Sequence, residues 1–317
     1  MERLYDKLKA YSESDFYAFH MPGHKRNKAL LGIELPYDLD ITEIDGFDDL
    51  HHADGILKEE QERAARVFGA EESHFLVNGS TAGILSAVMG CTHRGDKILV
   101  ARHCHKSIYH AIYMNGLVPR YVYPEFDISM HMNGEISKED VAKALAAEPD
   151  IKAVVIVSPN YDGVVSDVKG IAEVAHSYRI PLIVDEAHGP HFGFHPAFPG
   201  RANDLGADVV IQSFHKTLPA MTQTAVLHLC SERVSEKLIR RFLGIYETSS
   251  PSYILMSSLD ACVAKLEKDS GRLFDEFTEN LEAARRQLGQ RRYIRLLQTP
   301  EETGEEKDEQ GTTEIFD

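Results

Sequence analysis

Short apolar runs alternate with helix-forming stretches along most of this chain, and that alternation restricts its fold more than any other feature. Short apolar runs bounded by turn residues are typical of buried strands, and helices between them indicate parallel strands joined by crossovers. The predicted strands are 75–77, 97–101, 121–123, 153–158, 181–185 and 208–212, and predicted helices include 55–68, 84–91, 138–147 and 168–178. The sequence therefore predicts an α/β protein with a mostly parallel sheet covered by helices.

The two ends of the chain depart from this alternation. An amphipathic N-terminal helix leads into an irregular stretch at 20–54 that is rich in Pro, Gly, His and Asp. Residues 232–290 have a helical pattern, 293–297 look like the start of a strand, and 301–309 are strongly acidic. The predicted parts are an N-terminal helix and arm at 1–54, a major domain at 55–292, and an acidic linker at 293–317.

Charge and cysteine content exclude several classes of protein. The 34 basic and 50 acidic residues give a net charge of -16, which disfavours nucleic-acid and anionic-membrane partners. No run approaches the ~20 apolar residues of a membrane span, and the N-terminus lacks a signal-peptide core. The four cysteines have no CxxC spacing and are too few for a disulfide scaffold, so reduced thiols and a cytoplasmic protein are expected.

A lysine lies in the short segment that directly follows one predicted strand. Residues 208–212 lead into Ser213, Phe214, His215 and Lys216. Ligands of α/β sheets bind beyond the carboxyl ends of the strands, where a lysine amine with a lowered pKa can form Schiff bases. The alternative is an ordinary solvated lysine, because lysine changes its pKa only when it is buried or suitably paired.

A candidate phosphate site comes after another predicted strand. Ser80 and Thr81 follow Gly79 at the start of a helix. Free backbone N–H groups, two hydroxyls and the positive end of the helix dipole would converge there on an anion. The alternative is plain helix capping, for which Ser and Thr are common residues.

Polar side chains follow two more strands. Asp185 ends the run PLIVD, where a carboxylate in an α/β crevice either takes part in function or caps the following turn. His105 lies in RHCHKS and His188 in HGPHFGFHP. Their spacing matches no common zinc motif, so stacking and hydrogen bonding are favoured and no metal site is expected.

These strand-end groups together meet the needs of one cofactor. Pyridoxal 5'-phosphate requires a phosphate anchor, a platform for its ring, an acid beside the pyridine nitrogen and a lysine for its aldehyde. Ser80 with Thr81, His105, Asp185 and Lys216 supply these groups in order along the chain. The sequence therefore predicts a pyridoxal-phosphate enzyme.

Beyond these groups, the sequence resembles the pyridoxal-phosphate-dependent Orn/Lys/Arg decarboxylases, and most closely their short bacterial form. The resemblance rests on FHMPGHK, DITEIDGFDDLHHADG, FGAEESHFLVNGSTAG, ARHCHKS, SPNYDG, VDEAHGPHFGFHP, ADVVIQSFHKTLPAMTQTAVLH and TSSPSY. It implies the major domain of a fold type I transferase, with a mostly parallel sheet of the seven-stranded type. The family continues into a small C-terminal domain, which the sequence predicts to be absent or incomplete here.

The resemblance also implies a role for each candidate residue. Lys216 forms the Schiff base with the cofactor, Asp185 pairs with the pyridine nitrogen, His105 stacks on the ring, and His188 lies near the phenolic oxygen. Phosphate contacts come from Ser80, Thr81, Ser213 and His215. Residues 248–250 approach the site across a dimer interface, so a homodimer or higher homo-oligomer is expected.

The implied reaction is decarboxylation of arginine, lysine or ornithine to the corresponding amine and CO₂, in polyamine-related metabolism, with arginine slightly favoured. Transamination on the same fold and a catalytically weak fragment stay open as alternatives. A cationic substrate side chain needs an acidic partner, and five carboxylates are candidates that the sequence does not rank. They are Asp45, Asp48, Asp49, Glu186 and Glu247, each of which fits a surface or capping role better.

Overall fold

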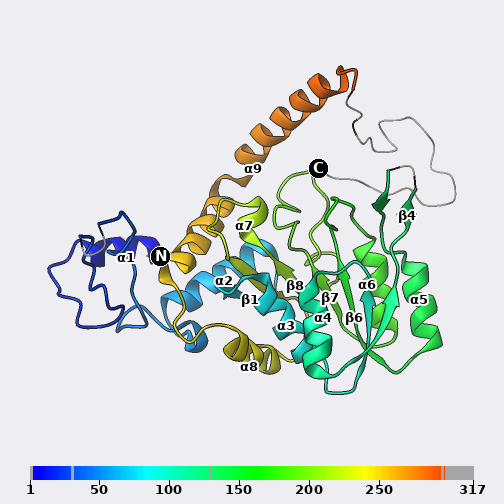
Figure 1. Cartoon of the computed structure of the whole chain (residues 1–317), viewed down its shortest axis with the longest axis horizontal. Helices are drawn as coiled ribbons and strands as arrows, with labels where there is room; N and C mark the ends of the chain where they lie inside the picture. The colour runs from blue at the N-terminus through cyan, green and yellow to red at the C-terminus, as the bar shows by residue number, and fades with distance from the viewer. Residues whose placement is uncertain (1–2, 30–31, 129, 294–295, 297–317) are drawn as a thin grey trace.

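A seven-stranded sheet forms the centre of the computed structural model, which describes residues 3–29, 32–128, 130–293 and 296 (Figure 1). The strand order is β1-β9-β8-β7-β6-β2-β3. The strands are β1 (Glu72–Leu76), β2 (Lys97–Ala101), β3 (Val118–Val122), β6 (Ile151–Val157), β7 (Leu182–Asp185), β8 (Val209–Gln212) and β9 (Ala225–Leu229). The predicted α/β fold with a mostly parallel sheet is confirmed.

Strand β9 runs against the others. It pairs antiparallel with β1 on one side and with β8 on the other, whereas β8, β7, β6, β2 and β3 pair in parallel. All five β9 residues are buried, so the strand lies well inside the sheet. The amino end of β9 therefore reaches the same edge of the sheet as the carboxyl ends of the other strands.

Helices flank the sheet, and a small hairpin of β4 (Phe126–Asp127) and β5 (Met132–Asn133) lies apart from it. The helices are α1 (Leu4–Ser12), the 3-10 helix η1 (Leu50–His52), α2 (Ile56–Phe68), α3 (Gly79–Cys91), α4 (Lys106–Asn115), α5 (Lys138–Ala147), α6 (Val168–Ser177), α7 (Phe214–Thr217), α8 (Glu236–Tyr246) and α9 (Tyr253–Gly289). Among the described residues, no helix has the length and apolarity to cross a bilayer.

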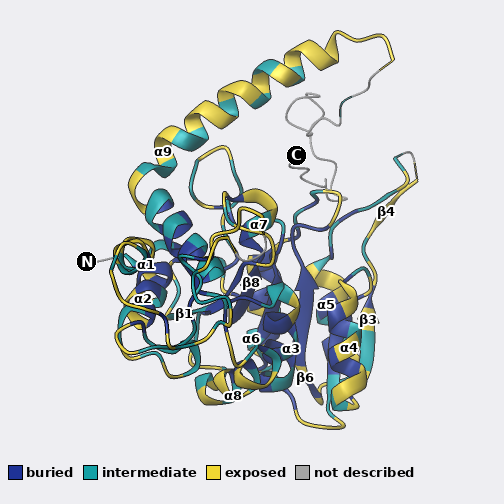
Figure 2. Cartoon of the chain, turned by 60° about the vertical axis from the view of Figure 1, so that its left-hand side comes forward, coloured by how far each residue is buried: buried dark blue, intermediate teal, exposed yellow. Residues whose placement is uncertain are grey.

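Two apolar cores lie on opposite faces of the β1–β9 end of the sheet. Adjacent residues of β1 belong to different cores. Phe75 lies in the core that includes residues of α1, α2 and α9, and Leu76 lies in the core that includes residues of α3 and α8. Successive side chains of a strand point to opposite faces, which explains the division. Figure 2 shows the buried sheet, and also that the distal part of α9, with mostly exposed residues, extends away from it.

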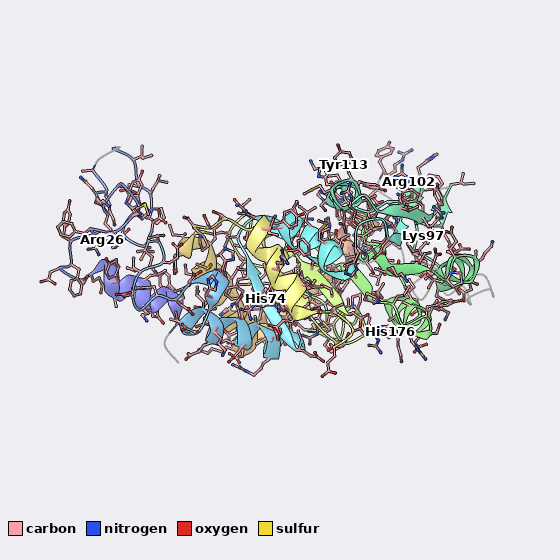
Figure 3. The ribbon with its side chains drawn as sticks, turned by 90° about the horizontal axis from the view of Figure 1, so that it is seen from below. Arg26, His74, Lys97, Arg102, Tyr113 and His176 are labelled. Atoms are coloured by element: carbon pink, nitrogen blue, oxygen red, sulfur yellow. The ribbon has the colours of Figure 1, made fainter. Side chains whose placement is uncertain are left out.

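The N-terminal arm lies at one end of the molecule. Arg26 and Arg102 mark opposite ends in Figure 3. Arg26 ties the arm back to α1, because its Nη1 donates to the Tyr11 carbonyl at 2.8 Å and its guanidinium lies 4.6 Å from the centre of the Tyr11 ring. The division of the chain at 54 and 292 stays a prediction, and most of 293–317 lies outside the described residues.

The predicted strands differ from the structure in several places. The strand expected at 75–77 is β1, which begins at Glu72 and ends at Leu76. The strand expected at 121–123 begins at Val118, because β3 is an edge strand, where Pro119 can lack an N–H without breaking an inner ladder. The 225–229 strand was not predicted, and it divides the otherwise parallel pattern. The strand-like 293–297 segment lies almost entirely outside the described residues.

A buried charge cluster joins α2 to α9. Arg63 Nη1 lies 3.0 Å from Asp260 Oδ1 and 2.9 Å from Glu60 Oε2, and all three residues are buried. Burial, reinforced by Asp260, raises the pKa of Glu60 to about 8, so Glu60 keeps its proton at neutral pH. Arg63 is therefore the cation that compensates the buried Asp260.

We expect Arg63→Leu to lower the free energy of unfolding by about 3–5 kcal/mol, because it leaves a buried carboxylate without its counter-charge. Arg286→Leu is the matched control, since Arg286 pairs with Glu282 on the exposed part of α9. That change should cost less than about 1 kcal/mol. Urea denaturation measures both, and equal losses in the two variants would contradict the assignment.

Candidate active site

The predicted site residues come together at one edge of the sheet. Asp185 is the last residue of β7, and Lys216 lies in α7, which begins two residues after β8. His105 follows β2, and Ser80 lies in α3, which follows β1. Parallel strands place their carboxyl ends at one edge, and the structure brings these four side chains to that edge.

The charges of Lys216 and Asp185 shift each other's pKa, although the two side chains form no ion pair. Burial raises the pKa of Asp185 to about 6, against the opposing effects of a hydrogen bond from the Ala187 N–H and the Lys216 charge. Partial burial lowers the pKa of Lys216, although much of its side chain is exposed, and Asp185 acts in the opposite direction. Among the described residues the two groups form neither a salt bridge nor a hydrogen bond with each other.

Two imidazole rings lie beside the amine. Burial, with help from the Lys216 and Lys106 charges, lowers the pKa of His105. Its Nδ1 accepts the Ser107 N–H at 3.3 Å, which fixes the ring at the start of α4. Burial, then Lys216 and His105, lowers the pKa of His188 to about 4. Both rings are therefore neutral near pH 7 and can stack or hydrogen-bond.

The start of α7 presents unsatisfied polar atoms. Ser213 is fully buried, and its Oγ has no hydrogen-bond partner among the described residues. His215 Nδ1 donates to the Thr224 carbonyl at 2.9 Å, which leaves Nε2 for another partner. A buried hydroxyl without a partner is costly unless a ligand satisfies it. These atoms fit the contacts that an anionic ligand would make.

The start of α3 supplies further groups for an anion. Asn78 is the N-cap, and the hydroxyls of Ser80 and Thr81 have no hydrogen-bond partner within the described chain. The N-cap position of α3 is therefore held by Asn78 and by neither of these two residues. Glu247 secures the turn, since its Oε2 accepts the N–H groups of Val77 at 3.0 Å and Asn78 at 3.1 Å.

Gln223 is a site residue that the sequence reasoning missed. It precedes β9 with a φ of 83°, a value that side-chain-bearing residues seldom adopt. Its Nε2 donates to the Val77 carbonyl at 2.6 Å, so it joins the turn before β9 to the turn before α3. Recognising 225–229 as an antiparallel strand would have placed Gln223 at this edge.

A hydrogen-bond chain runs across the sheet to the residue after Asp185. The Ser73 hydroxyl lies 2.7 Å from His228 Nδ1, His228 Nε2 donates to Gln212 Oε1 at 3.1 Å, and Gln212 Nε2 donates to Glu186 Oε2 at 2.6 Å. All four side chains are buried. Burial lowers the pKa of His228 to about 3 and raises that of Glu186 to about 8. These hydrogen bonds between uncharged side chains hold the residue that follows β7 in place.

The carboxylates considered for a cationic substrate mostly have structural partners. Glu186 is buried and accepts a hydrogen bond from Gln212, and Glu247 accepts backbone N–H groups in the turn before α3. Asp48 Oδ2 accepts the N–H groups of Gly55 and Leu57 at 2.9 Å and so caps α2, while Asp49 accepts the His51 N–H. The structural role that the sequence favoured fits these four. Asp45 is exposed.

Residues 248–250 lie beside the arm. The Thr248 carbonyl accepts a hydrogen bond from His51 Nε2 at 2.8 Å. Their approach to a site across a dimer interface stays a prediction. Within the described part of the chain, no group of three His, Cys, Asp or Glu side chains is arranged to hold a metal ion, and all four cysteines are free thiols.

Fold and site together define an α/β protein with a partly desolvated lysine facing a buried carboxylate across the strand ends. The model of the family "Orn/Lys/Arg decarboxylase, major domain" matches residues 3–307. The chain belongs to this family.

Individual relatives agree with that match. The chain is 42% identical over 263 residues to the Bacillus subtilis "Uncharacterized protein YaaO", which covers 81% of this chain and 55% of that protein. It is 36% identical over 294 residues to an arginine decarboxylase of the same organism, across 90% of this chain and 60% of the relative. The solved Escherichia coli constitutive lysine decarboxylase superposes with a TM-score of 0.78 at 25% identity, over 90% of this chain and 43% of the other. The chain thus spans 55–60% of the length of the two Bacillus subtilis relatives and 43% of the Escherichia coli enzyme.

We expect Gln212→Leu to lower the free energy of unfolding. The substitution removes the hydrogen-bond partner of both His228 Nε2 and Glu186 Oε2, and both atoms belong to buried side chains. Each group left without its partner should cost about 1–3 kcal/mol. Gln287→Leu on the exposed part of α9 is the control and should change stability by less than about 0.5 kcal/mol. Urea denaturation of both variants tests this, and a neutral Gln212→Leu would show that the hydrogen-bond chain is dispensable.

Proposed function

We propose that this protein is a pyridoxal-phosphate-dependent decarboxylase of a basic amino acid. The observation that carries the proposal is the placement of the Lys216 amine and the Asp185 carboxylate at neighbouring strand ends. Their charges interact, yet they form no ion pair among the described residues. Membership of the Orn/Lys/Arg decarboxylase family supports the same reaction.

The residues present fit pyridoxal phosphate. The partnerless Ser213 Oγ, the free Nε2 of His215 and the start of α3 with Ser80 and Thr81 would hold its phosphate. His105 would support one face of the ring. When bound, the cofactor supplies an electron-accepting ring that withdraws electrons from the bond broken at the substrate's α-carbon.

The protein's own groups have distinct tasks in this proposal. Lys216 would hold the cofactor covalently and release it to the substrate amine, which requires the neutral amine that burial favours. Asp185 would keep its carboxylate next to a cationic ring nitrogen, because an opposite charge in a buried site favours the ionised acid. His188 is neutral and can accept or donate a hydrogen bond beside Lys216.

Arginine is the substrate that we propose, with agmatine and CO₂ as products and a place in polyamine-related metabolism. Several relatives named arginine decarboxylase are 35–36% identical to this chain, whereas lysine decarboxylases of Pseudomonas aeruginosa and Escherichia coli are 30% and 28% identical. This difference supports arginine.

We also propose a cytoplasmic homodimer or higher homo-oligomer. The arm exposes large apolar side chains: Phe16 is 68%, Tyr17 69%, Phe19 90% and Met21 68% exposed. Soluble monomers rarely expose a contiguous apolar surface of this kind, so a second copy of the chain is the partner that we expect to cover it.

The function is tested with Lys216→Ala and a panel of arginine, lysine and ornithine. We expect the native chain with pyridoxal phosphate to show a near-visible absorbance band, to be trapped by borohydride, and to release CO₂. Lys216→Ala should lose the band, the trapped adduct and at least about 10³-fold in CO₂ release, as expected for loss of a covalent catalyst. An α-keto acid product without CO₂ would indicate transamination, and a native chain without the band would contradict cofactor use.

The lowered pKa of Lys216 predicts a pH dependence for cofactor capture. Only the neutral amine attacks the aldehyde, so the rate should rise with pH and then level off. The midpoint of this rise should lie below 10.5, the usual pKa of a lysine. Asp185→Asn removes the charge that raises the Lys216 pKa, so the midpoint should move to lower pH. Stopped-flow absorbance measures both rates, with Lys216→Ala giving the background. A midpoint that moves upward in Asp185→Asn would refute the coupling.

A further inference from the structure

A cavity of about 460 Å³ opens next to the predicted cofactor lysine. Thr217, the neighbour of Lys216 in the sequence, lines it together with His188 and with residues 159–163 of the loop after β6. His191 Nδ1 lies 3.2 Å from the Thr217 hydroxyl, which fixes this side of the wall. A substrate whose α-carbon reacts near Lys216 could place its side chain in this cavity.

Most of the wall is aromatic. Phe198 packs edge-on against Phe274 of α9 at 5.2 Å between ring centres and against His191 at 4.9 Å. Burial lowers the pKa of His191 to about 4, so this ring is uncharged at neutral pH. Such a wall matches a chain of methylene groups, which gain free energy by leaving water.

Asp162 is the one carboxylate among the described residues that line the cavity. It is exposed, and within the described chain its side chain has neither a hydrogen-bond nor a salt-bridge partner. The Asp162 charge acts to raise the pKa of His103, but burial has the larger effect and lowers it. The His103 imidazole is therefore uncharged and does not neutralise the Asp162 carboxylate. This carboxylate therefore differs from Glu186, Glu247 and Asp48, whose oxygens accept backbone or amide N–H groups.

The backbone around Asp162 is held in place. Buried Asn160 accepts the N–H of Asp162 at 2.9 Å and that of Val164 at 3.0 Å through its side-chain oxygen. Its Nδ2 donates to the Asn133 carbonyl at 3.0 Å. Next to Asp162, the Tyr161 ring contacts His188 edge-on at 5.8 Å. These hydrogen bonds hold the backbone that carries the Asp162 carboxylate, in a loop that contacts His188.

We propose that Asp162 determines specificity by binding the cationic end of a basic amino-acid substrate, while the aromatic wall takes its methylene chain. The inference rests on the proposed function and deepens it, because it assigns an acidic partner that was not among the five carboxylates named from the sequence. A guanidinium or ammonium group would form a charge-assisted hydrogen bond with this carboxylate, and a neutral side chain would not.

The test compares L-arginine with L-citrulline, a neutral analogue of the same length, in native and Asp162→Asn chains loaded with pyridoxal phosphate. Binding is measured from the change in cofactor absorbance, and turnover from CO₂ release. In the variant we expect the Kd and KM for arginine to rise on the order of 10- to 100-fold. The preference for arginine over citrulline should fall by the same factor, while the absorbance band without amino acid stays unchanged.

Asp162→Glu and Glu173→Gln complete the design. The longer acid keeps the charge and should restore part of the preference for arginine. Glu173 is an exposed carboxylate of α6 that does not line the cavity, so its loss should leave both substrates unaffected. Unchanged discrimination in Asp162→Asn, with arginine still turned over, would overturn this inference alone. A native chain that binds cofactor but neither binds nor decarboxylates any basic amino acid would overturn the proposed function with it.

Discussion

Parallel pairing of β8, β7, β6 and β2 is the constraint on which the rest of this structure depends. It brings residues from distant parts of the chain to a single edge, so that a carboxylate after one strand faces an amine after the next. The antiparallel β9 adds its preceding turn to the same edge. Gln223 and Thr224 thereby support the starts of α3 and α7, which hold the candidate anion-binding groups.

Burial then decides which charges this edge can use. Desolvation raises the pKa of Asp185 and lowers those of Lys216 and His188, so each group is less charged than it would be in water. A ligand carrying a positive ring nitrogen would reverse the effect on Asp185. Behind the edge, Glu186 and Gln212 form a hydrogen-bonded support without a formal charge facing the site. The polar interior thus stabilises the strand end and leaves the reactive groups unpaired.

Much of this could be predicted from the sequence because strand-end chemistry follows local patterns. The runs before Asp185 and Lys216 are short and apolar; Asp185 ends one of them and Lys216 follows the other within four residues. The sequence predicted less well where an interaction partner lies far away along the chain. Glu186 and Asp162 are both carboxylates in loops that follow strands, yet Glu186 is buried against Gln212 and Ala202 while Asp162 is exposed and lines a cavity. No local pattern separates them.

The sequence alone determined the α/β class, the order of candidate groups and the resemblance to the Orn/Lys/Arg decarboxylases, since these depend on residue types and spacings along the chain. The tertiary structure decided the direction of β9, the structural roles of Asp48 and Glu247, and the position of Asp162 beside the predicted cofactor lysine. These features depend on hydrogen bonds and packing between residues as much as 170 positions apart, such as Val77 and Glu247. Such contacts exist only once the sheet has formed.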